Sequence, residues 1–261
     1  MGDHSRDHPT FCGGNEISKA TETLYFRIFV KSFCMSQTTL ISFFQYSGLK
    51  HKWHALGRMG RPPIKLNEVE GLSFFKPLGT GSGNGFSIRP DFSTFGFVAV
   101  FDSEERAKTY LTTETIQQYT KTAISYSHVL MHTIKSHGEW SKQNPFESSV
   151  QFDKSKPLAV ITRATIKPKL AHKFWKYVPS VSKSMNDYNE LIFSKGIGEF
   201  PLLMQATFSL WNNAEAMMQY AYQNPKHAEM VKKTRELGWY SEELFARFQP
   251  FYQEGNLIPM L

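Results

Sequence analysis

Apolar and polar positions alternate, or aromatic and β-branched residues cluster, in segments that recur along the chain. Such segments favour strands, because these side chains suit a pleated, half-buried surface. In the first half they predict strands at 39–46, 71–78, 94–101 and 127–135. In the second half they predict strands at 158–166, 191–196, 205–211 and 245–252.

Helical spacing fills most of the intervals between these strands. We expect helices at 51–59, after a cap at Asp102 or Ser103, at 114–122, and from 170 to about 185 with a break near Pro179. Two more helices follow the strand that ends at residue 211. Each half then has the order β-α-β-β-α-β, which is the ferredoxin-like unit.

The two halves can be overlaid on each other. The segment VAVFDSEERAKTYL matches FSLWNNAEAMMQYA, which places Phe101 opposite Trp211 and Gln117 opposite His227. The predicted fold is therefore α+β, with tandem ferredoxin-like repeats at 35–137 and 157–261 forming one dimeric-α/β-barrel-type unit. The Pro-containing segment 138–156 is the expected connector. Residues 1–34 lack the pattern of a secretory signal, and we expect a poorly ordered or non-native extension.

The junction between the last two helices carries the most specific local signal. Asn212 or Asn213 caps the first of them, and Asn224-Pro225 ends it, because proline cannot continue the helical ladder. His227 then stands in the first turn of the next helix, where packing does not require a histidine. It is interpreted either as a metal ligand or as a surface residue of an amphipathic helix.

Composition narrows the function further. The 261 residues include 22 Phe, which suit either an aromatic core or a cavity for a flat apolar ligand. The net charge of +7 favours an acidic protein partner or an anionic membrane surface. Both cysteines, Cys12 and Cys34, precede the predicted fold, so its body lacks a cysteine-ligated haem or iron–sulfur cluster. Scarce cysteine fits a reducing cytoplasm. We find no nucleic-acid motif.

Six segments in one order resemble a known family. They are RMGRPPI from Arg58, FFKPLGTGSGNGFSIRP from Phe74, AVITRATI from Ala159, FWKYVPSVS from Phe174, KGIGEFPLLMQATFSLW from Lys195 and GWYSEELFARF from Gly238. Over about 38–253 the chain is similar to the spheroidene monooxygenase (carotenoid 2-ketolase) family. The stretch around His227 also resembles the haem-binding arm of dimeric α+β-barrel proteins.

This resemblance implies a haem-dependent monooxygenase that oxygenates C2 of an acyclic carotenoid, by hydroxylation and then ketone formation. It implies haem b as cofactor, dioxygen as co-substrate and a ferredoxin-type electron donor. His227 is the implied iron ligand, with Trp211 and Arg58 as further haem-binding candidates. A carotenoid resides in a bilayer, so we expect a cytoplasmic enzyme with peripheral contact at the inner membrane face.

Arg163 lies inside an apolar predicted strand and needs a partner, because a buried charge is costly alone. One interpretation is an ion pair with Glu199. The other is a distal, catalytic donor over the haem.

Other functions remain open at this stage. One is a different haem enzyme on the same barrel, either aldoxime dehydratase-like or haem-degrading. Another is a non-enzymatic haem- or lipid-binding protein. A non-haem metal site would need one of the pairs His128/His132 or His51/His54. The glycine-rich GTGSGNG (79–85) lacks the ending of a nucleotide-binding loop and favours a close ligand approach or a lid.

Overall fold

The computed structural model describes residues 36–60, 68–83 and 87–261; the predicted extension at 1–34 lies outside this range. Eight strands close into a barrel in the order β1-β3-β2-β6-β7-β5-β8-β4. The first half contains β1 (Thr38–Gln45), α2 (Leu49–Gly60), β2 (Leu72–Gly81), β3 (Pro90–Phe101), α3 (Glu104–Leu111), α4 (Glu114–Thr122) and β4 (Ser125–Gly138). The second contains β5 (Leu158–Ile166), α5 (Ala171–Ser184), β6 (Leu191–Phe200), β7 (Met204–Trp211), α6 (Ala214–Gln223), α7 (Pro225–Leu237) and β8 (Tyr240–Gly255).

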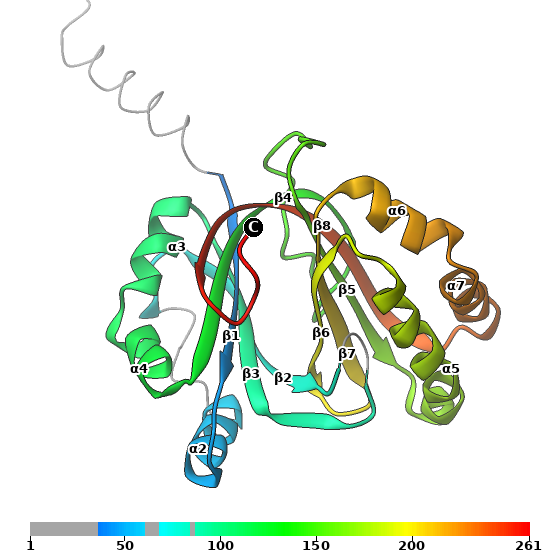
Figure 1. The fold of residues 1–261 in the computed structure, drawn as a ribbon, viewed down its shortest axis with the longest axis horizontal. Helices are drawn as coiled ribbons and strands as arrows, with labels where there is room; N and C mark the ends of the chain where they lie inside the picture. Colours follow the sequence, from blue (N-terminus) through cyan, green and yellow to red (C-terminus); the bar gives the residue numbers. More distant parts are fainter. Residues whose placement is uncertain (1–35, 61–67, 84–86) are drawn as a thin grey trace, which may run out of the picture. The chain divides into compact units, whose positions relative to one another are not determined.

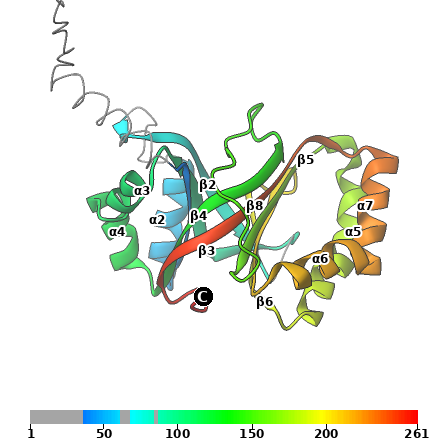
Figure 2. The ribbon, with the colours of Figure 1, turned by 90° about the horizontal axis from the view of Figure 1, so that it is seen from above.

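Helices cover the barrel on two opposite sides. Figures 1 and 2 show α2, α3 and α4 on one side and α5, α6 and α7 on the other, with the strands between them. Each half therefore repeats the order β-α-β-β-α-α-β. This confirms the predicted α+β class and the tandem ferredoxin-like plan.

The register of the strands confirms the overlay of the halves. In the first half Thr38 pairs with Phe101, and in the second Leu158 pairs with Trp211. The helix that follows each pair is capped alike, because Ser103 and Asn213 each accept a hydrogen bond from the backbone N–H three residues on. Equivalent residues can thus be compared position by position.

Three apolar layers stabilise this arrangement. The barrel interior is filled mainly by branched and aromatic side chains from both halves, including Phe43, Phe208 and Phe248. A second cluster joins the outer face of the first half to α3 and α4. On the outer face of the second half, one cluster packs against α6 and another joins α5 to α7.

Several boundaries depart from prediction, including the start of β3 and the ends of β2 and β6. Strands β4 and β8 run on past the predicted ends, because residues 135–138 pair with residues 244–247. The break predicted near Pro179 is wrong, since α5 continues to Ser184. Burial of Phe174, Trp175 and Val178 in the cluster with α7 offsets the helical penalty of proline, which is about 3 kcal/mol.

Candidate functional site

The junction between α6 and α7 holds His227 in place. The side chain of Asn224 accepts hydrogen bonds from the backbone N–H groups of Lys226 and His227, at 3.1 Å each, and so caps α7. Pro225 occupies the first turn, where its missing N–H costs nothing. The break that the sequence predicted thus fixes the backbone of His227 directly.

The imidazole of His227 is fixed as well. Its Nδ1 lies 2.8 Å from the carbonyl oxygen of Ala221. A carbonyl can only accept, so Nδ1 carries the proton and Nε2 keeps its lone pair. Burial lowers the pKa of His227 below its usual range, against the opposing effect of the Ala221 hydrogen bond. The ring is therefore a neutral imidazole in the tautomer that metal-binding histidines adopt.

Tyr220 connects His227 to Trp211. The ring of Tyr220 lies 4.9 Å from that of His227 and 5.5 Å from that of Trp211, measured between centroids. Trp211 is buried, and its Nε1 donates to the Ser209 hydroxyl at 3.0 Å. The predicted candidate Trp211 thus belongs to the same aromatic cluster as His227, one ring away. Tyr220 was not among the predicted residues.

The outer face of the second half differs from that of the first in the size of its side chains. In the first half this face carries four phenylalanines, at Phe44, Phe75, Phe95 and Phe97. At the equivalent register positions the second half carries Ala164, Ser194, Gln205 and Thr207. Four aromatic rings of the first half are thus replaced by small or polar side chains in the second.

Thr162 is an exposed position on the same outer face. It lies on the outer face of β5, between Val160, which packs against α6, and Ile166, which packs against α5 and α7. Although helices flank it on both sides, Thr162 is exposed. The two helix-packed clusters therefore leave Thr162 open to solvent, on the helical side that carries His227.

Arg163 faces the other way. Side chains alternate along a strand, so Arg163 points into the barrel while Thr162 and Ala164 face the helices. Its guanidinium pairs with Glu242 and lies 3.5 Å from Glu199. The predicted ion pair with Glu199 is confirmed, and Glu242 is an additional partner. Because the sheet separates Arg163 from His227, this geometry gives no support to a distal role.

The ion pairs of Arg163 belong to a network inside the barrel, the inner network, that extends to the connector at 138–156. Glu199 also accepts from Nε1 of Trp140 at 2.6 Å and pairs with Lys76 at 2.8 Å. Glu242 accepts from the backbone N–H groups of Ser141 and Lys142. Burial raises the pKa of Glu242, but the hydrogen bond from Lys142 and the attraction of Arg163 outweigh it and lower that pKa. These contacts give the charged side chains inside the barrel a structural role.

The remaining candidates lie apart from His227. Arg58 belongs to α2, on the opposite helical side, and its side chain is outside the described residues. His128 forms a hydrogen bond with Ser42 at 2.8 Å, and His132 pairs with Glu104 at 2.9 Å. Within the described ranges there is no group of three metal-binding side chains. The proposed His128/His132 metal site thus lacks a third ligand there, and the side chain of His54 is not described.

Comparison with known proteins identifies relatives over most of the chain. It is 31% identical over 219 residues to spheroidene monooxygenase of Rhodobacter capsulatus, covering 83% of this chain and 91% of that protein. It is 33% identical over 187 residues to that of Rubrivivax gelatinosus, covering 71% of each. With the Cereibacter sphaeroides enzyme it is 32% identical over 215 residues, covering 82% of this chain and 66% of that protein, just under two thirds. No family model matches.

Solved structures agree on the fold. An aldoxime dehydratase superposes with a TM-score of 0.56 at 10% identity, covering 83% of this chain and 82% of its own. Another, in complex with butyraldoxime, also gives 0.56, at 8% identity, covering 83% and 80%. Among the described residues, no helix is long and apolar enough to cross a membrane. On its sequence relatives, the chain belongs to the spheroidene monooxygenase family.

Proposed function

We propose that this chain is a haem-dependent monooxygenase that oxygenates C2 of an acyclic carotenoid, first to an alcohol and then to a ketone. The substrate and the reaction class rest on the named function of the relatives, which are spheroidene monooxygenases. The cofactor rests on one observation, the neutral imidazole of His227 on the helical side whose sheet face has small or polar side chains where the first half has four phenylalanines.

The residues present fit a haem. His227 donates its Nδ1–H to Ala221, so Nε2 is available to bind iron, as in other histidine-ligated sites. Among the described residues Nε2 has no hydrogen-bond partner. The small side chains at Ala164, Ser194 and Thr207 would form the floor of the site. Tyr220 and Trp211 would border it with aromatic surface.

Bound there, haem supplies the dioxygen activation and one-electron chemistry that hydroxylation of a C–H bond requires. Each round consumes dioxygen, two electrons from a ferredoxin-type donor and two protons, inserts one oxygen atom and releases water. A second hydroxylation at the same carbon, followed by loss of water, gives the ketone. His227 would hold the haem, and α5, α6 and α7 would flank it.

Haem titration of the purified chain tests this proposal. We expect stoichiometric binding with the Soret band of a histidine-ligated haem, and its loss in His227→Ala. His137→Ala, at an exposed histidine of β4, is the control and should bind as the parent does. A folded parent that takes up no haem would refute the cofactor assignment.

The loaded enzyme is then supplied with an acyclic carotenoid, dioxygen and a reduced ferredoxin. Formation of a C2 alcohol and ketone supports the monooxygenase. Haem binding without carotenoid turnover would contradict the substrate assignment and favour another haem function on this barrel, such as an aldoxime dehydratase. The likeness of this chain to solved aldoxime dehydratases concerns the fold alone.

A further inference from the structure

Large apolar side chains are exposed together at one end of the barrel. They lie at the start of α2, at the connection between β2 and β3, and at the turn between β6 and β7, which Figure 1 shows at the lower end of the molecule. We call this set the apolar end: Leu49, Trp53, Ile88, Phe92, Phe200, Leu202 and Met204. Trp53 is 69% exposed, and Phe92 and Phe200 are each 57% exposed.

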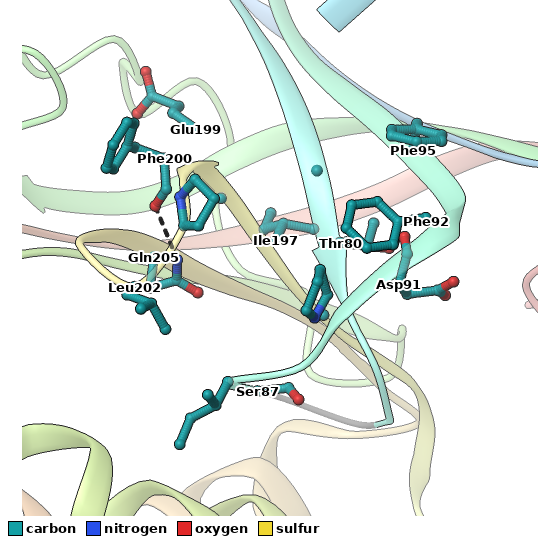
Figure 3. A pocket seen from close by; sticks show the side chains of 16 residues that line it. Thr80, Ser87, Asp91, Phe92, Phe95, Ile197, Glu199, Phe200, Leu202 and Gln205 are labelled. Atoms are coloured by element: carbon teal, nitrogen blue, oxygen red, sulfur yellow. Dashed lines mark hydrogen bonds between the residues drawn. The ribbon is translucent and has the colours of Figure 1, made fainter. Parts of the chain in front are cut away.

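Four of these residues surround one cavity. Ile88, Phe92, Phe200 and Leu202 line a single cavity of about 130 Å³, where the two turns meet (Figure 3). The backbone N–H of Tyr46 donates to the carbonyl of Ser93 at 2.7 Å. The chain therefore enters α2 beside the residue that follows Phe92, which joins Leu49 and Trp53 to the same end.

Leu202 is held outward at a conformational cost. Its φ of 66° lies in the left-handed region, where a branched side chain is disfavoured and glycine would be unstrained. The Trp175 Nε1 donates to the carbonyl oxygen of Leu202 at 3.0 Å and fixes the turn. An exposed leucine kept in such a position is unusual for a turn that only connects two strands.

The charge of this end is positive. Lys50 and Arg89 are exposed within it. Segments 48–53, 87–92 and 200–204 contain a single acidic residue, Asp91, whose carboxylate pairs with Lys195 at 2.9 Å. Glu199, which lines the same cavity, is neutralised by Lys76 at 2.8 Å. Apolar side chains beside cations that form no ion pair within the described ranges match the interface of a bilayer that contains anionic lipids.

We propose that the apolar end docks on an anionic lipid bilayer, with Trp53, Phe92 and Phe200 inserted among the lipid headgroups and acyl chains. Tryptophan and phenylalanine anchor proteins at this depth, and Lys50 and Arg89 would contact lipid phosphates. A second copy of the chain fits less well, because a two-fold interface would bring the same cations face to face. The biological meaning, extraction of a carotenoid from the bilayer, rests on the proposed function.

The five tryptophans make the test specific. Trp53 is exposed, whereas Trp140, Trp175, Trp211 and Trp239 are at most 7% exposed. Vesicles of phosphatidylglycerol and phosphatidylcholine with brominated acyl chains should therefore quench Trp53 selectively. We expect the full chain to bind these vesicles, to lose binding in high salt, and to bind pure phosphatidylcholine weakly.

The triple variant Trp53→Ser, Phe92→Ser, Phe200→Ser should bind anionic vesicles at least about tenfold more weakly, because it loses the three side chains that would insert into the bilayer. Tyr222→Ser is the matched control, because Tyr222 on α6 is also 69% exposed, and it should bind as the parent does. Equal binding by the triple variant and the parent would overturn the proposal. The proposal would also be overturned if the parent is a dimer that does not bind vesicles and the triple variant is a monomer.

Binding is measured without haem and repeated with His227→Ala. Vesicle binding that persists in His227→Ala shows that the docking surface is independent of the haem site. A failure of docking and a failure of the proposed function are therefore separate results.

Discussion

Gln117 and His227 occupy equivalent positions in the two halves, and each donates a side-chain N–H to the carbonyl oxygen six residues earlier. The Gln117 amide nitrogen lies 3.3 Å from the oxygen of Leu111, and Nδ1 of His227 lies 2.8 Å from that of Ala221. The hydrogen bond is thus a shared feature of both helix pairs. Only the imidazole leaves a second nitrogen with a free lone pair after making it.

This equivalence predicts a variant that separates folding from ligation. His227→Gln should keep the hydrogen bond to Ala221, as Gln117 does in the first half, and change the free energy of unfolding by less than about 1 kcal/mol. It should nevertheless abolish the Soret band of a histidine-ligated haem. The measurements are a denaturant titration and a haem titration of the same preparation. A variant that binds haem as tightly as the parent, with an unchanged spectrum, would exclude His227 as the ligand.

The loss of phenylalanines from the outer face predicts a second variant. Thr207 stands where the first half has Phe97, so Thr207→Phe should refill part of the space over the sheet. We expect haem affinity to fall by at least about tenfold, because an added ring competes with the macrocycle for the same volume. Thr207→Val has nearly the volume of threonine and serves as the control. Equal affinities in the two variants would show that the haem does not lie over Thr207.

Asn224 predicts a positioning effect. Its side chain accepts from the N–H of His227, so Asn224→Ala should cost about 1 kcal/mol of stability and loosen the first turn of α7. Asn213→Ala removes an equivalent cap from α6, where Asn213 accepts from Ala216 at 2.9 Å. Both variants should lower the unfolding midpoint similarly, but only Asn224→Ala should broaden or shift the Soret band. Identical spectra in both would mean that the cap does not orient the imidazole.

Much of this arrangement could be predicted from the sequence. Local patterns predicted the eight strands, the break at Asn224-Pro225 and the equivalence of Gln117 and His227 in the two halves. The direction of Arg163 did not, because the apolar residues of 158–166 lie on both faces of the strand and do not show which face is inward. Its main partner, Glu242, is distant in sequence and lies on β8, which begins earlier than predicted.

The small residues of the outer face were also missed, although their signal was present. Once Phe101 is placed opposite Trp211, the same offset places Phe95 and Phe97 opposite Gln205 and Thr207. That contrast becomes interpretable only when the register shows that all four side chains face the helices. Strand pairing, which the sequence does not show, supplied this information.

The inner network predicts a stability effect without a spectral one. Glu242→Gln removes the charge that balances the buried guanidinium of Arg163 and should destabilise the fold by about 3 kcal/mol. Glu243→Gln, at an exposed neighbour, should change stability little. Denaturant midpoints measure both, and the Soret band of loaded protein should be the same. A lost or shifted band in a stable Glu242→Gln variant would return Arg163 to the haem site.

His128 predicts how stability depends on pH. Burial lowers the pKa of His128 to about 4, while nearby Glu254 raises it slightly, against 6.5 for an unperturbed histidine. The unfolded chain therefore binds the proton more readily than the folded one between these values. The contribution of neutral His128 to the free energy of unfolding is fully present above about pH 6.5 and is lost as pH falls toward 4, by on the order of 3 kcal/mol.

The variant His128→Gln, which can still form a hydrogen bond with Ser42, should flatten the dependence of the unfolding free energy on pH across this window. His137→Gln, at an exposed site, should not. A parent and a His128→Gln variant with parallel pH profiles would show that another group governs the acid sensitivity.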